Sequence, residues 1–422
     1  MNPSTSPTLG SPASTYQAGL FWFALFTALA TLGLVGMGGL VTSHGVGMAV
    51  PDWPTSYGYN MFALPLSTWL TGGIFHEHTH RLWASEVGIL TVLLNCWLFG
   101  KKSRPLVRWL GVLLVVMGLA GLHRPNGLQA SIHIGIHGVA MLAASFFWPR
   151  REAAAKHLRW LGVIALVAVL LQGLLGGLRV VWDAQIVADV RLGTAFGILH
   201  GCLGQGFLVL AAVLALLTSR WWLERPQNQQ ERAQAGAGNI LIRRWFLFAT
   251  LLISAQLLIA ATMRHQHAGL AIPDFPLAYG GLWPDMSAEA LARYNMQRVE
   301  VTAAHPITAF QITLQMAHRI MALFIVMAVA VCAWKTPAGT SLRRLANVWV
   351  GLILVQIALG AWTIWSNKAA DVATAHVVVG ALSLVTGALG CLISFRRLTG
   401  PVPVSAVITN ESEAGMADRV SI

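Results

Sequence analysis

Ten long apolar segments constrain the fold of this chain more than any other feature. They lie at about 19–41, 81–99, 107–122, 128–148, 158–178, 194–217, 243–263, 315–334, 345–364 and 373–395. A helix that crosses a bilayer needs about 20 apolar residues, and its backbone polar groups must be paired within the segment. Only 10% of the residues are charged, whereas soluble domains carry about 25%. The sequence therefore predicts an all-α integral membrane protein with about ten transmembrane helices.

The distribution of basic residues predicts how these helices are oriented. If the N-terminus is inside, the inner segments are 101–108, 150–159, 220–244, 335–344 and the tail from Arg396, and they hold 19 of the 28 Lys and Arg residues. Basic loops stay in the cytoplasm. We therefore expect a protein of the cell inner (plasma) membrane with both termini cytoplasmic. We attribute the net charge of +12 to this topology and to contact with anionic membrane lipid, not to nucleic-acid binding.

The chain contains an internal repeat. GVGMAVPDWPTSYG at 45–58 recurs as HAGLAIPDFPLAYG at 267–280, with seven of the twelve positions from Gly47 to Gly58 identical. Three further matches follow in the same order. They are His80-Arg81 with His318-Arg319, QGLLGG (172–177) with QIALGA (356–361), and His200 with His376.

The spacing of these matches predicts the organisation of the chain. The offset rises from 222 to 238 and then falls to 184, which indicates 16 extra residues in the second outer loop and 54 in the first half. The 54 residues fit a helical hairpin at about 107–148. We therefore expect two pseudo-symmetric four-helix transmembrane bundles in tandem repeat plus an inserted hairpin. The predicted parts are an N-terminal polar tail (1–18), a first half (19–220), a linker (221–242), a second half (243–397) and a C-terminal tail (398–422).

Each half repeats two histidines at the outer ends of its helices: His80 and His200, then His318 and His376. Ionisable side chains at membrane depth are costly and usually face a cavity or a ligand. Two imidazoles that face each other across a helix bundle suit the two axial positions of haem iron, whereas zinc normally takes three or four protein ligands. Arg81 and Arg319 each follow a candidate ligand. They could pair with haem propionates, or simply extend to the membrane interface.

One difference between the halves affects their capacity for proton transfer. In FHEHTHRLW (75–83), Glu77 lies three positions before His80, and the repeat aligns it with Gln315. A carboxyl group can transfer a proton and an amide cannot, so the first half is predicted to be the reactive one. The alternative is that Glu77 is a solvated acid that favours the N-terminus of a helix.

His76 and His78 have no counterparts in the second half, where Leu314 and Met316 stand. His133 and His137 are four residues apart in the inserted hairpin and could bind a metal as a pair. By default we expect these histidines to be polar residues of the membrane interface, with a metal or proton-relay role as the alternative. The same holds for His44 in the first outer loop and for His265, His267 and His305 in the second.

Together, the ordered motifs resemble the haem A synthase family. They are GGLVTSHGVGMAVPDWPTSYG, GGIFHEHTHR, QGLLGGLRV and ILHG in the first half and HAGLAIPDFPLAYG, QMAHR and TAHVVVG in the second, and the similarity spans most of residues 20–395. Two features depart from the family pattern. Residues 42–78 hold no cysteine where many relatives carry a pair, and the 54-residue insertion is added to the common eight-helix arrangement.

The resemblance implies a membrane oxidase that converts the C8 methyl group of haem O to the formyl group of haem A through successive hydroxylations. It implies that His80 and His200 hold the substrate haem, that His318 and His376 hold a haem b cofactor, and that Glu77 is catalytic. Both sites would lie near the outer (periplasmic) side of the membrane. The implied partners are a haem O donor (haem O synthase) and cytochrome oxidase assembly factors, and a homo-oligomer is left open.

Two other functions stay open from the residues alone. A non-enzymatic dihaem b-type electron carrier would use the same four histidines. A metal transporter would use the surplus outer histidines, although the repeated ones lie at one face rather than near the bilayer midplane.

Overall fold

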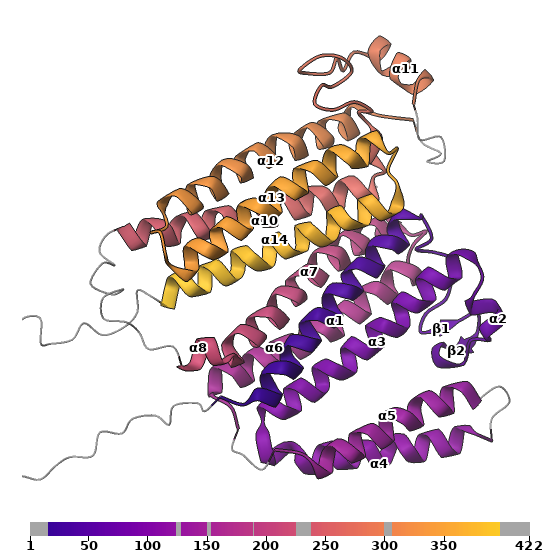
Figure 1. Cartoon of the computed structure of the whole chain (residues 1–422). Coiled ribbons are helices and arrows are strands. Elements are labelled where there is room, and N and C mark those ends of the chain that lie inside the picture. The colour runs from indigo at the N-terminus through magenta and orange to yellow at the C-terminus, as the bar shows by residue number, and fades with distance from the viewer. Residues whose placement is uncertain are drawn as a thin grey trace, which may run out of the picture.

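The computed structural model describes residues 16–123, 128–149, 153–188, 190–224, 238–298 and 306–396. Helices dominate these residues (Figure 1), and nine of the helices are long and apolar enough to cross a membrane. The chain is therefore an all-α multi-pass membrane protein, as its apolar segments predict. Most of the predicted N-terminal tail (1–15), the middle of the linker (225–237), His305 and the predicted C-terminal tail lie outside the described residues.

Ten long helices of the described chain correspond to the ten predicted spans, and the second of them, α3, is not among the nine counted above. They are α1 (Ala18–Ser43), α3 (Gly72–Leu98), α4 (Arg104–Gly121), α5 (Leu128–Phe146), α6 (Lys156–Val181), α7 (Leu192–Thr218), α10 (Gly238–His265), α12 (Ala309–Lys335), α13 (Ser341–Trp365) and α14 (Ala370–Arg396). The short helices are η1 (Met61–Ala63), α2 (Leu66–Trp69), η2 (Gly100–Ser103), α8 (Arg220–Glu224), η3 (Ala268–Leu270) and α11 (Ala288–Met296). Two antiparallel strand pairs complete the described elements, β1 (Thr55–Ser56) with β2 (Tyr59–Asn60) and β3 (Ile186–Val187) with β4 (Val190–Arg191).

Eight of these helices pack as two groups of four with the same pattern of neighbours. In the first group, α1 and α6 each pack against both α3 and α7. In the second group, α10 and α13 each pack against both α12 and α14. Helix α14 also contacts α1 and α7, and α10 contacts α7, so the groups lie side by side (Figure 1). That they form separate domains with the boundaries given above stays a prediction.

The two ends of the helix groups differ. The segment with β1, β2 and α2 and the segment with α11 lie at one end, called here the loop end, and α8 lies at the other (Figure 1). Each apolar core fills the half of its group that is remote from the loop end. Phe246 stacks on the fully buried Trp349 in the second group, and Leu94, Phe207 and Leu214 pack together in the first. The polar residues that repeat between the groups lie in the other half, toward the loop end.

The inserted hairpin, α4 with α5, is held together by glycines. A Cβ on Gly118 would lie 3.0 Å from Gly135 Cα, and one on Gly138 would lie 2.6 Å from the backbone nitrogen of Val115. The two backbones therefore touch, as is typical of membrane helices that pack through small residues. Outside its own pair, the hairpin contacts α3, η1 and the adjoining η2.

One predicted boundary differs substantially from the structure. The second span was expected to begin at residue 81, but α3 begins at Gly72. Hydropathy locates only the apolar part of a helix, and the first turns of α3 carry three histidines, Glu77 and Arg81. The FHEHTHR stretch therefore lies inside the helix, where Glu77 and His78 are buried.

Candidate functional site

The structure brings the four repeated histidines together as two pairs in the loop-end half. The rings of His80 on α3 and His200 on α7 have centroids 6.5 Å apart, and those of His318 on α12 and His376 on α14 are 6.4 Å apart. Two metal–nitrogen bonds of about 2 Å each, plus the half-widths of two imidazoles, add up to roughly 6 Å. Each pair is therefore spaced to hold one metal atom between its rings.

The surroundings of these rings fit a haem iron. All four histidines are half-buried between helices. The Nδ1 atoms of His80, His318 and His376 are buried and have no hydrogen-bond partner among the described residues. Buried polar atoms without a partner are uncommon, so they need an explanation. Nδ1 of His200 lies 3.1 Å from the carbonyl oxygen of Gln172. The donor set of each pair is two imidazoles with no carboxylate or thiolate, which matches bis-histidine haem ligation.

Glycines make room for the rings at matching positions of the two groups. A Cβ on Gly176 of α6 would lie 3.0 Å from Cε1 of His200, and one on Gly360 of α13 would lie 3.1 Å from Cε1 of His376. Likewise, a Cβ on Gly38 of α1 would lie 3.1 Å from Cε1 of His80. Such distances are tighter than nearly all real Cβ contacts. A larger residue at these positions would displace the imidazole.

A glutamine lies one turn before each of the two matching glycines. Gln172 donates its amide to the carbonyl oxygen of His200 at 2.8 Å, and the amide nitrogen of Gln356 lies 3.3 Å from Nε2 of His376. Sequence reasoning did not single out these glutamines or glycines. The repeat of QGLLGG as QIALGA carried the signal, because both residue types recur in it.

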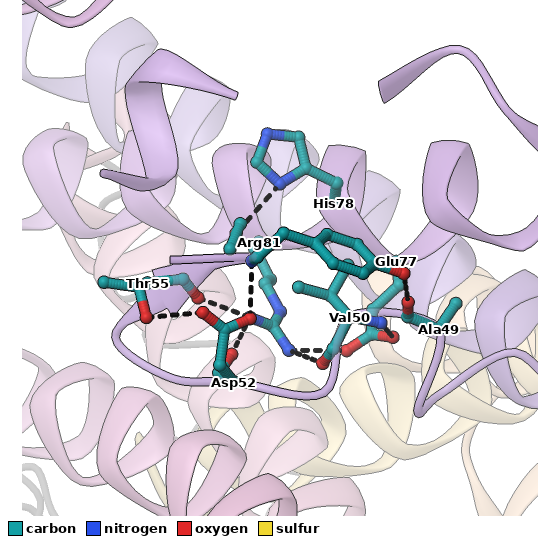
Figure 2. A network of polar contacts seen from close by, with 9 residues as sticks. Ala49, Val50, Asp52, Thr55, Glu77, His78 and Arg81 are labelled. Carbon is teal, nitrogen blue, oxygen red and sulfur yellow. Dashed lines mark hydrogen bonds and ion pairs between the residues drawn. The ribbon is translucent and has the colours of Figure 1, made fainter. Parts of the chain in front are cut away.

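Glu77 joins α3 to the first outer loop (Figure 2). Its Oε2 accepts the backbone N–H of Val50 at 2.8 Å, and its Oε1 accepts Nη2 of Arg81 at 2.7 Å. Arg81 also donates to the carbonyl oxygens of Val50 at 2.7 Å and Asp52 at 2.6 Å. Glu77 is only 4% exposed, so it is not a solvated acid at a helix terminus.

The second group repeats this arrangement with an amide in place of the acid. Gln315 Oε1 accepts the backbone N–H of Ile272 at 2.6 Å, and Arg319 donates to the carbonyl oxygens of Asp274 at 2.7 Å and Leu277 at 2.8 Å. The amide nitrogen of Gln315 turns to the carbonyl oxygen of Ile272 at 3.3 Å. Only the first group therefore has an ion pair here. Both arginines are occupied by loop carbonyls, and propionate contacts by Arg81 and Arg319 stay predictions.

The repeated loops have the same internal hydrogen bonds. Asp52 accepts the N–H groups of Tyr57 at 2.6 Å and Gly58 at 2.8 Å, and Asp274 accepts those of Tyr279 at 2.7 Å and Gly280 at 2.9 Å. Burial alone would raise the pKa of Asp52, but hydrogen bonds from Gly58, Thr55 and Tyr57 outweigh it and lower that pKa.

The tyrosine of the second loop is covered by the extra residues of that loop. Tyr279 stacks on Tyr294 of α11 with ring centroids 3.4 Å apart. Burial, with Tyr294 and Asp274 nearby, raises the pKa of Tyr279 to about 12. Tyr279 therefore stays a neutral phenol, which donates to the carbonyl oxygen of Ala271 at 2.6 Å.

Two histidines expected at the membrane interface lie on helices and pack against other elements. His265, predicted to be in the second outer loop, is the last residue of α10, and its ring would be 2.4 Å from a Cβ on Gly197 of α7. His78 is 1% exposed and lies 3.3 Å from the hydroxyl of Ser56. The loop position predicted for His265 was wrong. The burial of His78 could not be predicted, because tertiary packing covers helix ends that a sequence alone leaves at the surface.

Arg264 connects the two helix groups. This residue of α10 donates Nη2 to the carbonyl oxygen of Gly39 at 2.7 Å and to the hydroxyl of Ser43 at 2.6 Å, both on α1. Its repeat partner in the first half is Thr42, so repeat matching gave no reason to single it out.

Comparison with known proteins is consistent with this geometry. The profile of the family described as "Cytochrome oxidase assembly protein" matches residues 131–388. The chain is 24% identical over 408 residues to a heme A synthase from Geobacillus kaustophilus (strain HTA426), covering 95% of this chain and 99% of that protein. It is also 28% identical over 324 residues to a heme A synthase from Rhodospirillum centenum (strain ATCC 51521 / SW), covering 75% of this chain and 66% of that one.

Proposed function

The chain belongs to the cytochrome oxidase assembly protein family, and on this premise we propose that it converts the C8 methyl group of haem O to the formyl group of haem A. Both relatives named above are heme A synthases, which supports an oxidoreductase. The observation that carries the proposal is the presence of two histidine pairs, 6.5 and 6.4 Å between ring centroids, with an acid beside only one of them.

We assign the substrate haem to His80 and His200 and a haem b cofactor to His318 and His376. When bound, haem b would carry electrons one at a time, and the four-electron oxidation of a methyl to a formyl group would draw on an external oxidant such as O2. The chain's own contribution is position and proton handling. The paired imidazoles would hold the iron, and Gly176 and Gly360 leave room for the rings. The carboxylate of Glu77 can accept a proton where the amide of Gln315 cannot.

The orientation and partners belong to the same proposal. The excess of basic residues in the segments 101–108, 150–159, 220–244 and 335–344 supports a cytoplasmic location for α8 and for both termini. The loop end, and with it both histidine pairs, then lies at the periplasmic side of the inner membrane. A haem O synthase would deliver the substrate, and assembly factors of cytochrome oxidase would receive the product.

Extraction of haems tests this function. The protein is expressed with a haem O source and an electron supply, and its haems are separated by chromatography and identified by mass. We expect haem b together with hydroxylated or formyl haem. Two equivalents of haem b and no oxidised product, from a folded protein, would contradict the proposal and indicate a b-type electron carrier.

Variants separate the two haem sites in the same experiment. His200→Ala should lose the substrate haem and retain haem b, while His376→Ala should lose haem b. His157→Ala removes an exposed histidine at the start of α6 and should retain both haems.

A further inference from the structure

A third cluster of ionisable side chains lies apart from both histidine pairs. Glu86 of α3 meets His133 and His137 of α5, and one ligand atom from each lies within 4.8 Å of the other two. Glu86 follows His80 by six positions, which places it about 120° around α3 and about 9 Å along it. The cluster is therefore separate from the predicted haem site on the same helix.

The hydrogen bonds of His137 fix its protonation pattern. Nδ1 of His137 lies 2.9 Å from the carbonyl oxygen of His133, and its Nε2 lies 2.7 Å from Oε2 of Glu86. A carbonyl oxygen only accepts, so Nδ1 carries a hydrogen, and Nε2 of the neutral ring presents a lone pair to the carboxylate. Two acceptor atoms this close require a cation between them, either a proton or a metal ion. A backbone carbonyl on the other ring nitrogen is also the usual partner of a metal-bound histidine.

His133 distinguishes between these two cations. Its Nε2 is buried and lies 3.2 Å from Oε1 of Glu86, within ion-pair distance, but the contact does not have the geometry of a hydrogen bond. The ring is held in place by Phe62 of η1, which stacks on it with centroids 4.3 Å apart and planes at 15°. A proton shared by Glu86 and His137 would leave the nitrogen of His133 unused. One metal ion would use all three side chains.

The distances fit such an ion with little movement. Ligand atoms bonded at about 2 Å to a tetrahedral metal lie about 3.3 Å apart, and the two nitrogen–oxygen distances here are 2.7 and 3.2 Å. Two imidazoles and one carboxylate suit zinc and copper better than calcium or magnesium, which prefer all-oxygen sites. We propose that Glu86, His133 and His137 bind one divalent transition-metal ion of the zinc or copper class.

The ion would fasten the inserted hairpin to the first helix group. Glu86 belongs to α3 and the two histidines to α5, and Phe62 brings in the first outer loop. Among the described elements, α4 and α5 have few neighbours outside their own pair. A metal bridge would supply a strong tie where apolar contact between membrane helices gives little driving force.

Metal binding to the haem-loaded protein tests the proposal. The protein is purified with a tag that contains no histidine and is dialysed against a chelator and then against ZnCl2. We expect one equivalent of zinc, and in His133→Ala and Glu86→Gln at least about tenfold weaker binding. His123→Ala and His157→Ala change histidines outside the cluster and should bind zinc as the unaltered protein does. With CuCl2 as the probe, electron paramagnetic resonance should show hyperfine splitting from two nitrogens, reduced to one in His133→Ala.

Two results would overturn the metal site. One is equal zinc binding by the unaltered protein and His133→Ala, because the third ligand would then be irrelevant. The other is a loss of thermal stability in Glu86→Gln and His137→Ala that metal does not affect, with His133→Ala unchanged, because this indicates a shared proton. The haem absorbance of each variant verifies folding, and His133→Asn offers a smaller change of shape if His133→Ala does not fold.

Discussion

Glu77 and Gln315 show how one position can keep its structural role while its chemistry changes. Each side chain accepts a backbone N–H from the loop before it, from Val50 at 2.8 Å or from Ile272 at 2.6 Å. The carboxylate adds an ion pair with Arg81 at 2.7 Å, whereas Gln315 donates to carbonyl oxygens. The bond to the loop needs only the oxygen that both side chains offer, so the charge of Glu77 is what distinguishes the two groups here.

Glu77→Gln should separate these roles. An amide can still accept the Val50 N–H, as Gln315 does in the second group, so we expect a folded protein with both haems. Product formation should fall by about 100-fold or more, the usual contribution of a general acid or base. The measurement is the amount of hydroxylated and formyl haem formed per unit time, determined after extraction. The reciprocal Gln315→Glu variant is the control and should stay active; full activity of Glu77→Gln would remove Glu77 from the mechanism.

Gly176→Ala should act on one haem and Gly360→Ala on the other. The added methyl group would lie 3.0 or 3.1 Å from a histidine ring, and overpacking of this kind costs about 1–3 kcal/mol, so haem affinity should fall about tenfold or more. Haem content and spectra at each site measure the effect. Gly173→Ala and Gly351→Ala are matched controls on the same two helices, because a Cβ there meets nothing within 4 Å. Equal haem loss in variants and controls would contradict the role of Gly176 and Gly360 in making room for the histidine rings.

At the scale of elements, the first outer loop is organised around a single carboxylate. Asp52 accepts Thr55 Oγ1 at 2.5 Å as well as two backbone N–H groups. These bonds favour its charged form, so they stabilise the folded loop above the unfolded pKa of about 4 and lose that effect as the pH falls through the lower folded value.

Asp52→Asn should therefore lower the melting temperature at neutral pH, and the difference from the unaltered protein should narrow as the pH falls below about 4. Thermal unfolding in detergent from pH 7 to pH 3 measures this. Asp371→Asn, at an exposed acid near the start of α14, controls for the loss of one negative charge. A difference that stays constant over this range would contradict the assignment.

The helices themselves could be predicted because length and hydropathy determine them. All ten apolar segments correspond to helices, and the repeated histidines, found by spacing alone, form close pairs. Starts such as Gly72 of α3 could not be predicted, because polar turns at the membrane boundary carry no hydropathy signal. The tautomer of His137 and its contact with Glu86 were equally out of reach, since they depend on how α5 packs against α3 across 51 positions of sequence.

At the scale of the whole molecule, the two helix groups meet through α1, α7, α10 and α14. The interface includes contacts that have no repeat partner, such as the bonds from Arg264 to Gly39 and Ser43. A sequence repeat describes each half and says nothing about the surface between them. This relative placement was therefore not predictable from the matched motifs.

Arg264→Gln should loosen that interface. Hydrogen bonds from a charged donor contribute about 2 kcal/mol, so we expect a lower melting temperature with both histidine pairs still able to bind haem. Arg244→Gln changes an exposed arginine near the other end of α10 and serves as control. Equal melting temperatures for the two variants would show that Arg264 contributes nothing to the stability of the interface between the helix groups.

The matching hydrogen bonds from the backbone N–H groups of Val50 and Ile272 have an evolutionary consequence. Since an amide and a carboxylate offer the same oxygen to the same peptide hydrogen, a duplicated gene can exchange one for the other in a single copy without remodelling its scaffold. The charge at this position can then change in one copy while the hydrogen bond to the loop is kept. The two helix groups could in this way take on different functions, one in the reaction and the other in electron transfer.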